Sequence, residues 1–141
     1  MKSEPDVFSI DDLRRKNVAG WDGVRNYQAR KFMRAMRKGD CALFYHSSVI
    51  PPAIVGLMEI VKEAYPDSTA EGPGWDQVDV KFIKAFPRPL TLDEIKRTPA
   101  LQAMKLLKNS RLSVQPVTPA EWTLLSRLLE PQTALRRKKD C

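Results

Sequence analysis

The sequence has little capacity to bind metal, because its 141 residues include one histidine and two cysteines. A structural zinc site uses about four ligands, and Cys41 and Cys141 do not form a CxxC pair. These residue types therefore cannot supply a zinc site, and we expect no metal and no cofactor. The small number of cysteines favours a reducing compartment, so we expect a cytoplasmic protein.

Long hydrophobic runs are also missing. Charged residues interrupt every apolar run within a few positions, whereas about 20 consecutive apolar residues are needed to span a bilayer. No apolar leader stands at the start of the sequence, so we expect neither secretion nor a membrane partner. The apolar content of 43% is nevertheless typical of a globular protein, and the length suits a single domain.

Acidic residues are outnumbered by basic ones, which gives a formal net charge of +7. Residues 136–140 contribute a net +3 of this excess. We therefore expect one moderately basic domain over residues 1–130 and a basic, disordered tail over residues 131–141. A charge of this size fits either plain solubility or binding to a polyanion, so the position of the charge must decide between them.

A basic helix is predicted from Asn26 to Lys38, with Gly39 just beyond its end. At about 100° per residue, the apolar side chains fall on one flank and five positive side chains fall on the opposite flank. The positive flank carries Arg30, Lys31, Arg34, Arg37 and Lys38. This flank holds no acidic residue, which favours contact with a polyanion over simple exposure to solvent, although both interpretations stay open.

Strands and short helices are predicted around this basic helix. The strands cover residues 41–46, 53–65, 78–82 and 111–115. The short helices follow the N-cap residues Ser9, Thr91 and Thr118 and also cover residues 99–107. Few of these strands are long enough for a parallel α/β sheet. We therefore expect an α+β fold in which helices surround a small, mostly antiparallel sheet or barrel.

Groups suited to a nucleotide are crowded into the segment from Trp21 to Arg30, where a turn leads into the basic helix. The indole of Trp21 offers a flat stacking face, the Asn26 amide can read a base edge, and the Arg25 guanidinium suits phosphate. Trp21 could instead be a core residue, and Asn26 could cap the helix. This crowding is the main indication of nucleic-acid binding.

Six blocks, in order along the chain, resemble the EVE domain family of the PUA-like fold group. The blocks are Met1–Pro5, Phe8–Leu13, Trp21–Arg30, Phe44–Ser47, Gly56–Asp67 and Arg111–Thr118. The resemblance implies a PUA-like, partly open β-barrel of mostly antiparallel strands surrounded by short helices. It also implies a pocket that reads a modified base, with 5-substituted cytosine as the usual ligand class.

The predicted base pocket combines two strand ends with the Trp21 turn. It comprises Lys2, Ser3, Glu4, Trp21, Asn26, Tyr45, His46 and Ser47. Phosphates of the nucleic acid are expected to contact Arg25, Arg30, Arg34, Arg37, Arg111 and Ser113. Lys2 and Glu4 share a strand face because side chains alternate, and they could equally form an exposed charge pair. His46 could line the pocket rim or be a structural imidazole.

Three functions are compatible with these residues. The first is a non-catalytic reader of a modified base in DNA or RNA, whose partner is the nucleic acid. The alternative is a nucleoside-directed amidohydrolase of the ASCH type, in which Lys2 and Glu4 supply the reacting groups. The third is a protein-interaction module that uses Trp75, Phe82 and Phe86 as an apolar patch. We favour the reader, and the sequence leaves protein partners open.

Overall fold

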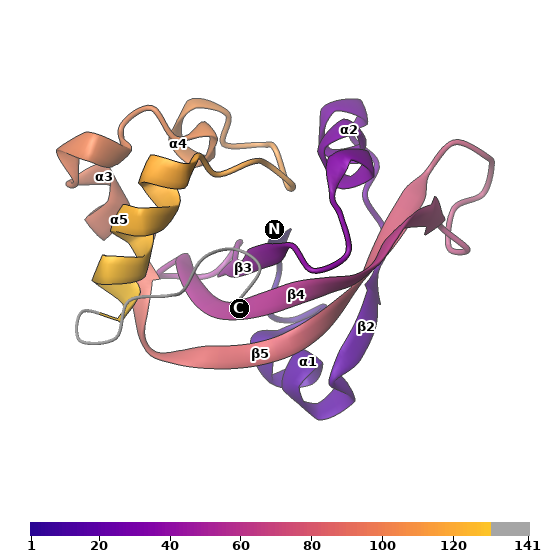
Figure 1. The fold of residues 1–141 in the computed structure, drawn as a ribbon, viewed down its shortest axis with the longest axis horizontal. Coiled ribbons are helices and arrows are strands. Elements are labelled where there is room, and N and C mark those ends of the chain that lie inside the picture. The colour runs from indigo at the N-terminus through magenta and orange to yellow at the C-terminus, as the bar shows by residue number, and fades with distance from the viewer. Residues whose placement is uncertain (131–141) are drawn as a thin grey trace.

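A computed structural model describes residues 1–130 of the chain (Figure 1). The strands are β1 (Lys2–Ser3), β2 (Val18–Trp21), β3 (Cys41–His46), β4 (Ala53–Pro66) and β5 (Asp76–Thr91). The helices are α1 (Ile10–Lys16), α2 (Tyr27–Ala35), α3 (Leu92–Lys96), α4 (Lys105–Lys108) and α5 (Pro119–Leu129), with a 3₁₀ turn η1 (Pro99–Leu101). The predicted basic tail over residues 131–141 lies outside the described residues.

The five strands form one sheet in the order β1-β3-β4-β5-β2. β1 pairs with β3 in parallel, and the other pairings are antiparallel. The register between β4 and β5 shifts at several bulges, which bend these two long strands (Figure 1). The α+β class with mostly antiparallel strands is confirmed. The sheet keeps β1 and β2 as separate edges and does not close into a barrel, and the PUA-like description stays a prediction.

Side chains of β3 alternate between two hydrophobic clusters. Ala42 and Phe44 join the cluster that contains the buried faces of α1 and α2. Cys41, Leu43 and Tyr45 join the cluster formed with α3, α4 and α5. Figure 1 shows α1 below the curved sheet and α3, α4 and α5 together at its left-hand end. Because the side-chain period of a strand is two, one short strand serves both clusters.

The predicted helix starts are confirmed. Ser9 and Asp12 form a capping box at the start of α1, in which each side chain accepts from a backbone N–H of the other residue. Thr91 starts α3 and Thr118 starts α5 with the same arrangement. Local sequence therefore determines where these three helices begin.

The basic helix is shorter than predicted. α2 begins after the N-cap Asn26 as expected, but it ends at Ala35 instead of Lys38. The backbone N–H of Arg37 donates to a carboxylate oxygen of Asp40, and that of Lys38 donates to Glu63. These side chains replace the helical carbonyl acceptors, so the chain leaves the helix early.

Two segments differ from the predicted strands. β2 is absent from the prediction, yet Val18–Trp21 pairs with β5 along its whole length. Residues 111–115 form no strand, so that prediction is wrong. A backbone bond from the Lys2 N–H to the Ser113 carbonyl (2.9 Å) ties this segment to β1, while its apolar side chains Leu112 and Val114 are buried in the core. The alternating pattern therefore reflects burial without a ladder of hydrogen bonds.

Candidate nucleic-acid interface

The parallel pairing of β1 with β3 divides the predicted base-pocket residues between two faces. Lys2 lies beside Tyr45, and Ser3 lies beside His46. Neighbouring residues of a strand point to opposite faces, so the first pair and the second pair cannot line the same side of the sheet. The sequence-predicted pocket is therefore split by the sheet that carries it.

Lys2 and Tyr45 line a cavity of about 570 Å³ between α2, β3, α5 and residues 115–117. Lys2 Nζ donates to the Ser110 carbonyl at 2.7 Å and lies 5.9 Å from the centre of the Tyr45 ring. Burial lowers the pKa of Lys2 and raises the pKa of Tyr45, because it disfavours the charged form of each. The other six predicted pocket residues do not line this cavity.

Trp21 is buried, with 7% of its surface exposed. Its indole makes edge contacts with Phe44, at 5.3 Å between ring centroids, and with Phe8, at 6.3 Å. Trp21 is therefore packed as a core residue, which is one of the two roles that the sequence allowed. A stacking role for the indole stays a prediction.

His46 and Asn26 also use their polar atoms within the fold. His46 Nε2 accepts from the Ile10 N–H (3.1 Å) at the start of α1, and burial lowers the pKa of the imidazole. Asn26 Oδ1 accepts from the Ala29 N–H (2.9 Å) and so caps α2. The cap uses the amide oxygen, so only the N–H₂ group of Asn26 could face a base.

The ends of β1 and β3 bring together a polar group that we call the serine–glutamate rim, made of Ser3, Glu4, Ser47 and Ser48. The Ser47 N–H donates to the Ser3 carbonyl at 3.0 Å, and Ser48 Oγ donates to Glu4 Oε1 at 3.3 Å. Ser3 Oγ donates to the Phe8 carbonyl at 2.6 Å. The Glu4 side chain is exposed, so its carboxylate can exchange the serine hydroxyl for another donor.

Arg25 is anchored to the β4–β5 hairpin tip, residues 67–75. Its guanidinium forms an ion pair with Asp67 at 2.9 Å, and the Asp67 side chain is fully buried. Asp67 also accepts from the Gly23 N–H (2.8 Å) and from Thr69. Burial by itself raises the pKa of Asp67, but the hydrogen bonds from Thr69, Gly23 and Arg25 more than offset it and hold the pKa well below its ordinary value. Asp67 thus fixes the turn that follows Trp21.

The hairpin tip also covers part of α2. Trp75 stacks on Tyr27 with 5.1 Å between ring centroids. The Arg30 guanidinium lies 4.9 Å from the Tyr27 ring and 5.3 Å from the Trp75 ring, and it donates to the Gly74 carbonyl at 2.5 Å. The rings of Tyr27 and Trp75 therefore both stabilise the charge of Arg30, which the sequence predicted to contact phosphate.

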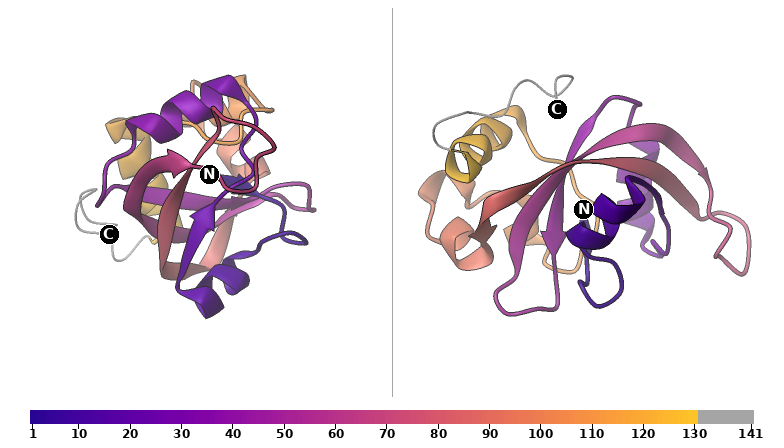
Figure 2. Two further views of the ribbon diagram at one scale, coloured as in Figure 1. Left: turned by 90° about the vertical axis from the view of Figure 1, so that its right-hand side faces the viewer. Right: turned by 90° about the horizontal axis from the view of Figure 1, so that it is seen from below.

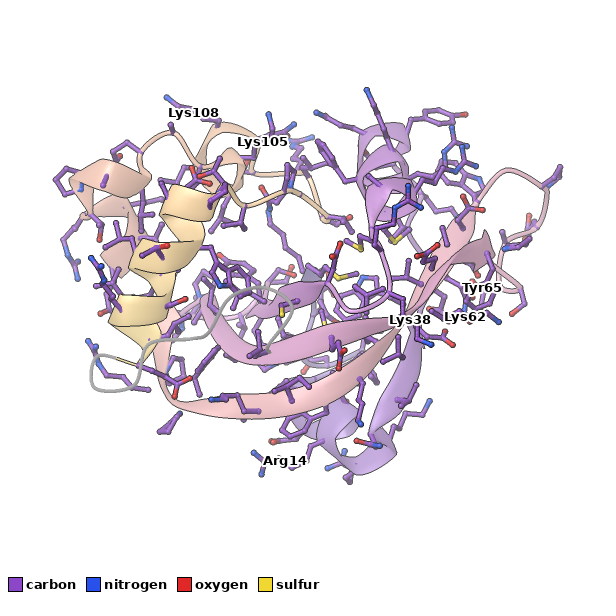
Figure 3. The ribbon with its side chains drawn as sticks, viewed as in Figure 1. Arg14, Lys38, Lys62, Tyr65, Lys105 and Lys108 are labelled. Atoms are coloured by element: carbon purple, nitrogen blue, oxygen red, sulfur yellow. The ribbon has the colours of Figure 1, made fainter. Side chains whose placement is uncertain are left out.

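The positive flank predicted for the helix over residues 26–38 lies beside acidic residues from other elements. Arg34 forms an ion pair with Asp76, and Arg37 lies 3.8 Å from Glu63. Both acids come from β4 and β5, so the helix sequence alone could not reveal them. Other cations lie elsewhere, with Arg14 on α1 below the sheet and Lys105 and Lys108 on α4 above it (Figure 3). Positive charge is therefore spread over several faces.

Arg111 and Ser113 belong to a segment that contacts the start of α2. Asn109 Nδ2 donates to Gln28 Oε1 at 3.3 Å, which joins this segment to the helix. Arg111 is exposed, while Ser113 is half-buried and its carbonyl accepts from β1. The segment thus connects the basic helix with the β1 edge.

The sequence did not predict the roles of three residues at the interface, Asp67, Tyr27 and Trp75. Asp67 lies in a turn-rich loop with no local signal for an ion pair to Arg25. Tyr27 and Trp75 stack across the fold, and Trp75 was expected in an apolar interaction patch with Phe82 and Phe86. Phe86 is buried, so that exposed patch does not form. All three roles depend on the hairpin folding back onto α2.

Known proteins are similar to this chain in sequence and in fold. Residues 1–128 match the EVE domain. The chain belongs to the EVE domain family. Thymocyte nuclear protein 1 of mouse (Mus musculus) is 42% identical to this EVE domain, over 94% of the chain and 73% of the relative.

Solved structures resemble this EVE domain over nearly its whole length. A hypothetical protein from Leishmania major is 46% identical with a TM-score of 0.86, covering 94% of this chain and 93% of that chain. The human THYN1 protein in complex with 5-methylcytosine containing DNA is 42% identical with a TM-score of 0.86, covering 92% and 95% of the two chains.

The expected cytoplasmic location is wrong in the light of these relatives, because those of mouse, rat and human are named nuclear proteins. A small number of cysteines fits the nucleus as well as the cytosol, because both compartments are reducing. The cysteine content could therefore not separate the two compartments.

Two features are absent from residues 1–130. No helix there has the length and hydropathy to cross a bilayer. In the same residues, no three or more His, Cys, Asp or Glu side chains are grouped as metal ligands would be.

Proposed function

We propose that this EVE domain binds DNA and reads a modified cytosine that has been turned out of the base stack. The observation that carries the proposal is the likeness to the human THYN1 protein in complex with 5-methylcytosine containing DNA, at 42% identity and a TM-score of 0.86. The likeness covers 92% of this chain and 95% of that chain, so the same mode of recognition is the simplest expectation. DNA is preferred to RNA because that neighbour holds DNA.

The proposed base site lies at the serine–glutamate rim and on the adjoining face of β3. A carboxylate is a good acceptor for the cytosine N4–H₂ group, and Glu4 is exposed at the rim. Ser3, Ser47, His46 and the N–H₂ of Asn26 would supply the remaining polar contacts. Trp21 would stack on the base once Phe8 moves away from the indole. Lys2 and Tyr45 face the cavity on the other side of the sheet, so the proposed base site does not include them.

The cations of α2 and its surroundings would hold the DNA backbone. Arg25 and Arg30 are already held by the hairpin tip, so little side-chain entropy is lost when they meet a phosphate. Arg34, Arg37 and Arg111 are exposed and would add electrostatic attraction. Affinity should therefore fall as the salt concentration rises.

Catalysis by Lys2 and Glu4 has less support. The lowered pKa of Lys2 suits a general base. However, Lys2 donates to Ser110 while Glu4 accepts from Ser48, and no ion pair within residues 1–130 joins the two. The names of the similar proteins describe nuclear and DNA-bound proteins and no reaction. We therefore propose binding without catalysis.

The test is a titration of duplexes that carry one 5-methylcytosine or one plain cytosine, followed by fluorescence anisotropy at several salt concentrations. The wild-type domain should prefer the modified duplex. Trp21→Ala should lose the preference, by about 5- to 150-fold for the 1–3 kcal/mol of a base–aromatic stack, and keep salt-dependent background binding. Glu4→Ala, an exposed substitution, is a second base-site variant that should stay folded.

Neutralising Arg30, Arg34 and Arg37 together is the opposite control. Affinity for both duplexes should fall, and the slope of log K against log salt should decrease by about 0.9 for each cation that contacts a phosphate. Equal wild-type affinity for the two duplexes, or no binding to either, would end the proposal. Matched single-stranded RNA identifies the outcome in which RNA is the partner.

A further inference from the structure

Two exposed apolar side chains belong to the loops that adjoin the serine–glutamate rim. Ile50 is 97% exposed and Val7 is 77% exposed, whereas most large apolar residues of the chain are buried. Exposed apolar residues are common singly, but these two belong to loops that meet at one acidic residue, Glu4. The exposure of two apolar side chains beside the same acidic residue suggests a common binding partner.

Hydrogen bonds fix both loops to Glu4. The β3–β4 loop, residues 47–52, is closed by the pairing of His46 with Ala53, and Ser48 Oγ donates to the Glu4 carboxylate. The turn that carries Val7 is closed by the Val7 N–H, which donates to the Glu4 carbonyl at 2.9 Å. Both views of Figure 2 show the two loops projecting side by side from the same end of the sheet.

The charges of these loops exclude phosphate as their partner. The β3–β4 loop contains no charged residue, and the turn from Glu4 to Phe8 contains Glu4 and Asp6 but no cation. Glu4 and Asp6 would repel a phosphate, and neither loop has a cation that would attract one. An apolar side chain next to a base-reading site meets instead the stacked bases of a duplex, which are the apolar part of DNA.

We propose that Ile50, supported by Val7, enters the base stack at the position left by the extruded cytosine. Apolar side chains that insert between base steps offset part of the cost of unstacking, which is a few kcal/mol for each step. Ile50 lies two residues beyond Ser48, so the side chain that fills the gap and the rim that reads the base belong to one loop. This inference rests on the proposed function.

Ile50→Ala tests the inference through the difference between duplex and single-stranded DNA. A single strand has no stack to fill, so the variant should bind a 5-methylcytosine duplex about 10-fold more weakly and the matched single strand within about 2-fold of wild type. A duplex with 2-aminopurine beside the modified base should brighten on binding wild type and brighten less with the variant. Val18→Ala is the matched control, because Val18 is exposed on β2 at the opposite sheet edge.

The outcomes separate this inference from the proposed function. If wild type does not distinguish the modified duplex from the plain one, the proposed function fails. If wild type does distinguish them and Ile50→Ala binds the duplex as wild type does, the inference alone is overturned. Equal weakening on duplex and single strand would also overturn it, because the contact would then not involve the stack. Unfolding curves of each variant establish that the folded protein was measured.

Discussion

Several side chains of the candidate interface already form contacts within the fold. Trp21 packs between Phe8 and Phe44, Asn26 caps α2, and His46 accepts from the start of α1. Each of these uses was one of the alternatives that the residue type allowed. Residue type and local sequence set the list of possible roles, and neighbours distant in sequence select among them.

The only histidine of the sequence gives a pH prediction. Burial lowers the pKa of His46 below its ordinary value of 6.5, and the neutral ring accepts from the Ile10 N–H. Protonation would remove that acceptor. The stabilising contribution of His46 is therefore complete above about pH 6.5 and is lost as the pH falls through the lowered folded-state pKa. Urea unfolding from pH 7.5 to pH 5 should show this loss.

His46→Gln keeps a side-chain acceptor but does not titrate, so it should flatten that part of the pH dependence. The single imidazole can be followed directly by NMR. A titration midpoint at or above 6.5 would contradict the prediction, because the folded state would then bind the proton at least as well as the unfolded chain does.

At the scale of elements, the β4–β5 hairpin and α2 work as one unit. The hairpin tip supplies the partner of Arg25, the ring that stacks on Tyr27 and the carbonyl that accepts from Arg30. Because these contacts orient three groups of the candidate interface, the hairpin determines how the basic helix presents its charge. A helix with the same sequence and no hairpin would present flexible cations.

Asp67→Asn should loosen this unit. The substitution keeps the shape of the side chain but removes the charge that Arg25, Thr69 and the Gly23 N–H contact, so the free energy of unfolding should fall by about 2 kcal/mol. Amide hydrogen exchange should speed up over residues 21–26. Asp76→Asn is the matched control, because its pair with Arg34 lies nearer the surface and should cost about 0–1 kcal/mol. Equal losses would show that burial of Asp67 does not matter.

For the whole molecule, one sheet holds two hydrophobic clusters together. β3 contributes alternate side chains to both, and β4 and β5 also have residues in each. The helices on the two clusters do not need to touch, since the shared strands couple them. The molecule should therefore unfold as one cooperative unit.

Leu13→Ala on α1 and Leu125→Ala on α5 test this coupling. Both leucines are 0% exposed, one in each cluster, so each substitution should lower the free energy of unfolding by about 2–5 kcal/mol. Both variants should keep a single transition in fluorescence and circular dichroism. Two separate transitions in either variant would show that the clusters unfold independently.

The sequence by itself determined the local structure of this protein. Side chains of Ser9, Asn26, Thr91 and Thr118 cap their helices within three residues, and apolar runs mark β3, β4 and β5. Six ordered blocks were also enough to identify the EVE domain family. These features were predictable because the interactions behind them lie close together along the chain.

Only the tertiary structure decided the rest. Pairing with β5 makes Val18–Trp21 a strand. Residues 111–115 form a single backbone bond to β1 and no strand. Acidic residues of β4 and β5 form ion pairs with Arg34 and Arg37 of the predicted positive flank. The parallel register of β1 with β3 separates Lys2 and Tyr45 from Ser3 and His46. Each of these outcomes depends on which distant segments meet and in what register, and no periodicity within a single segment specifies that.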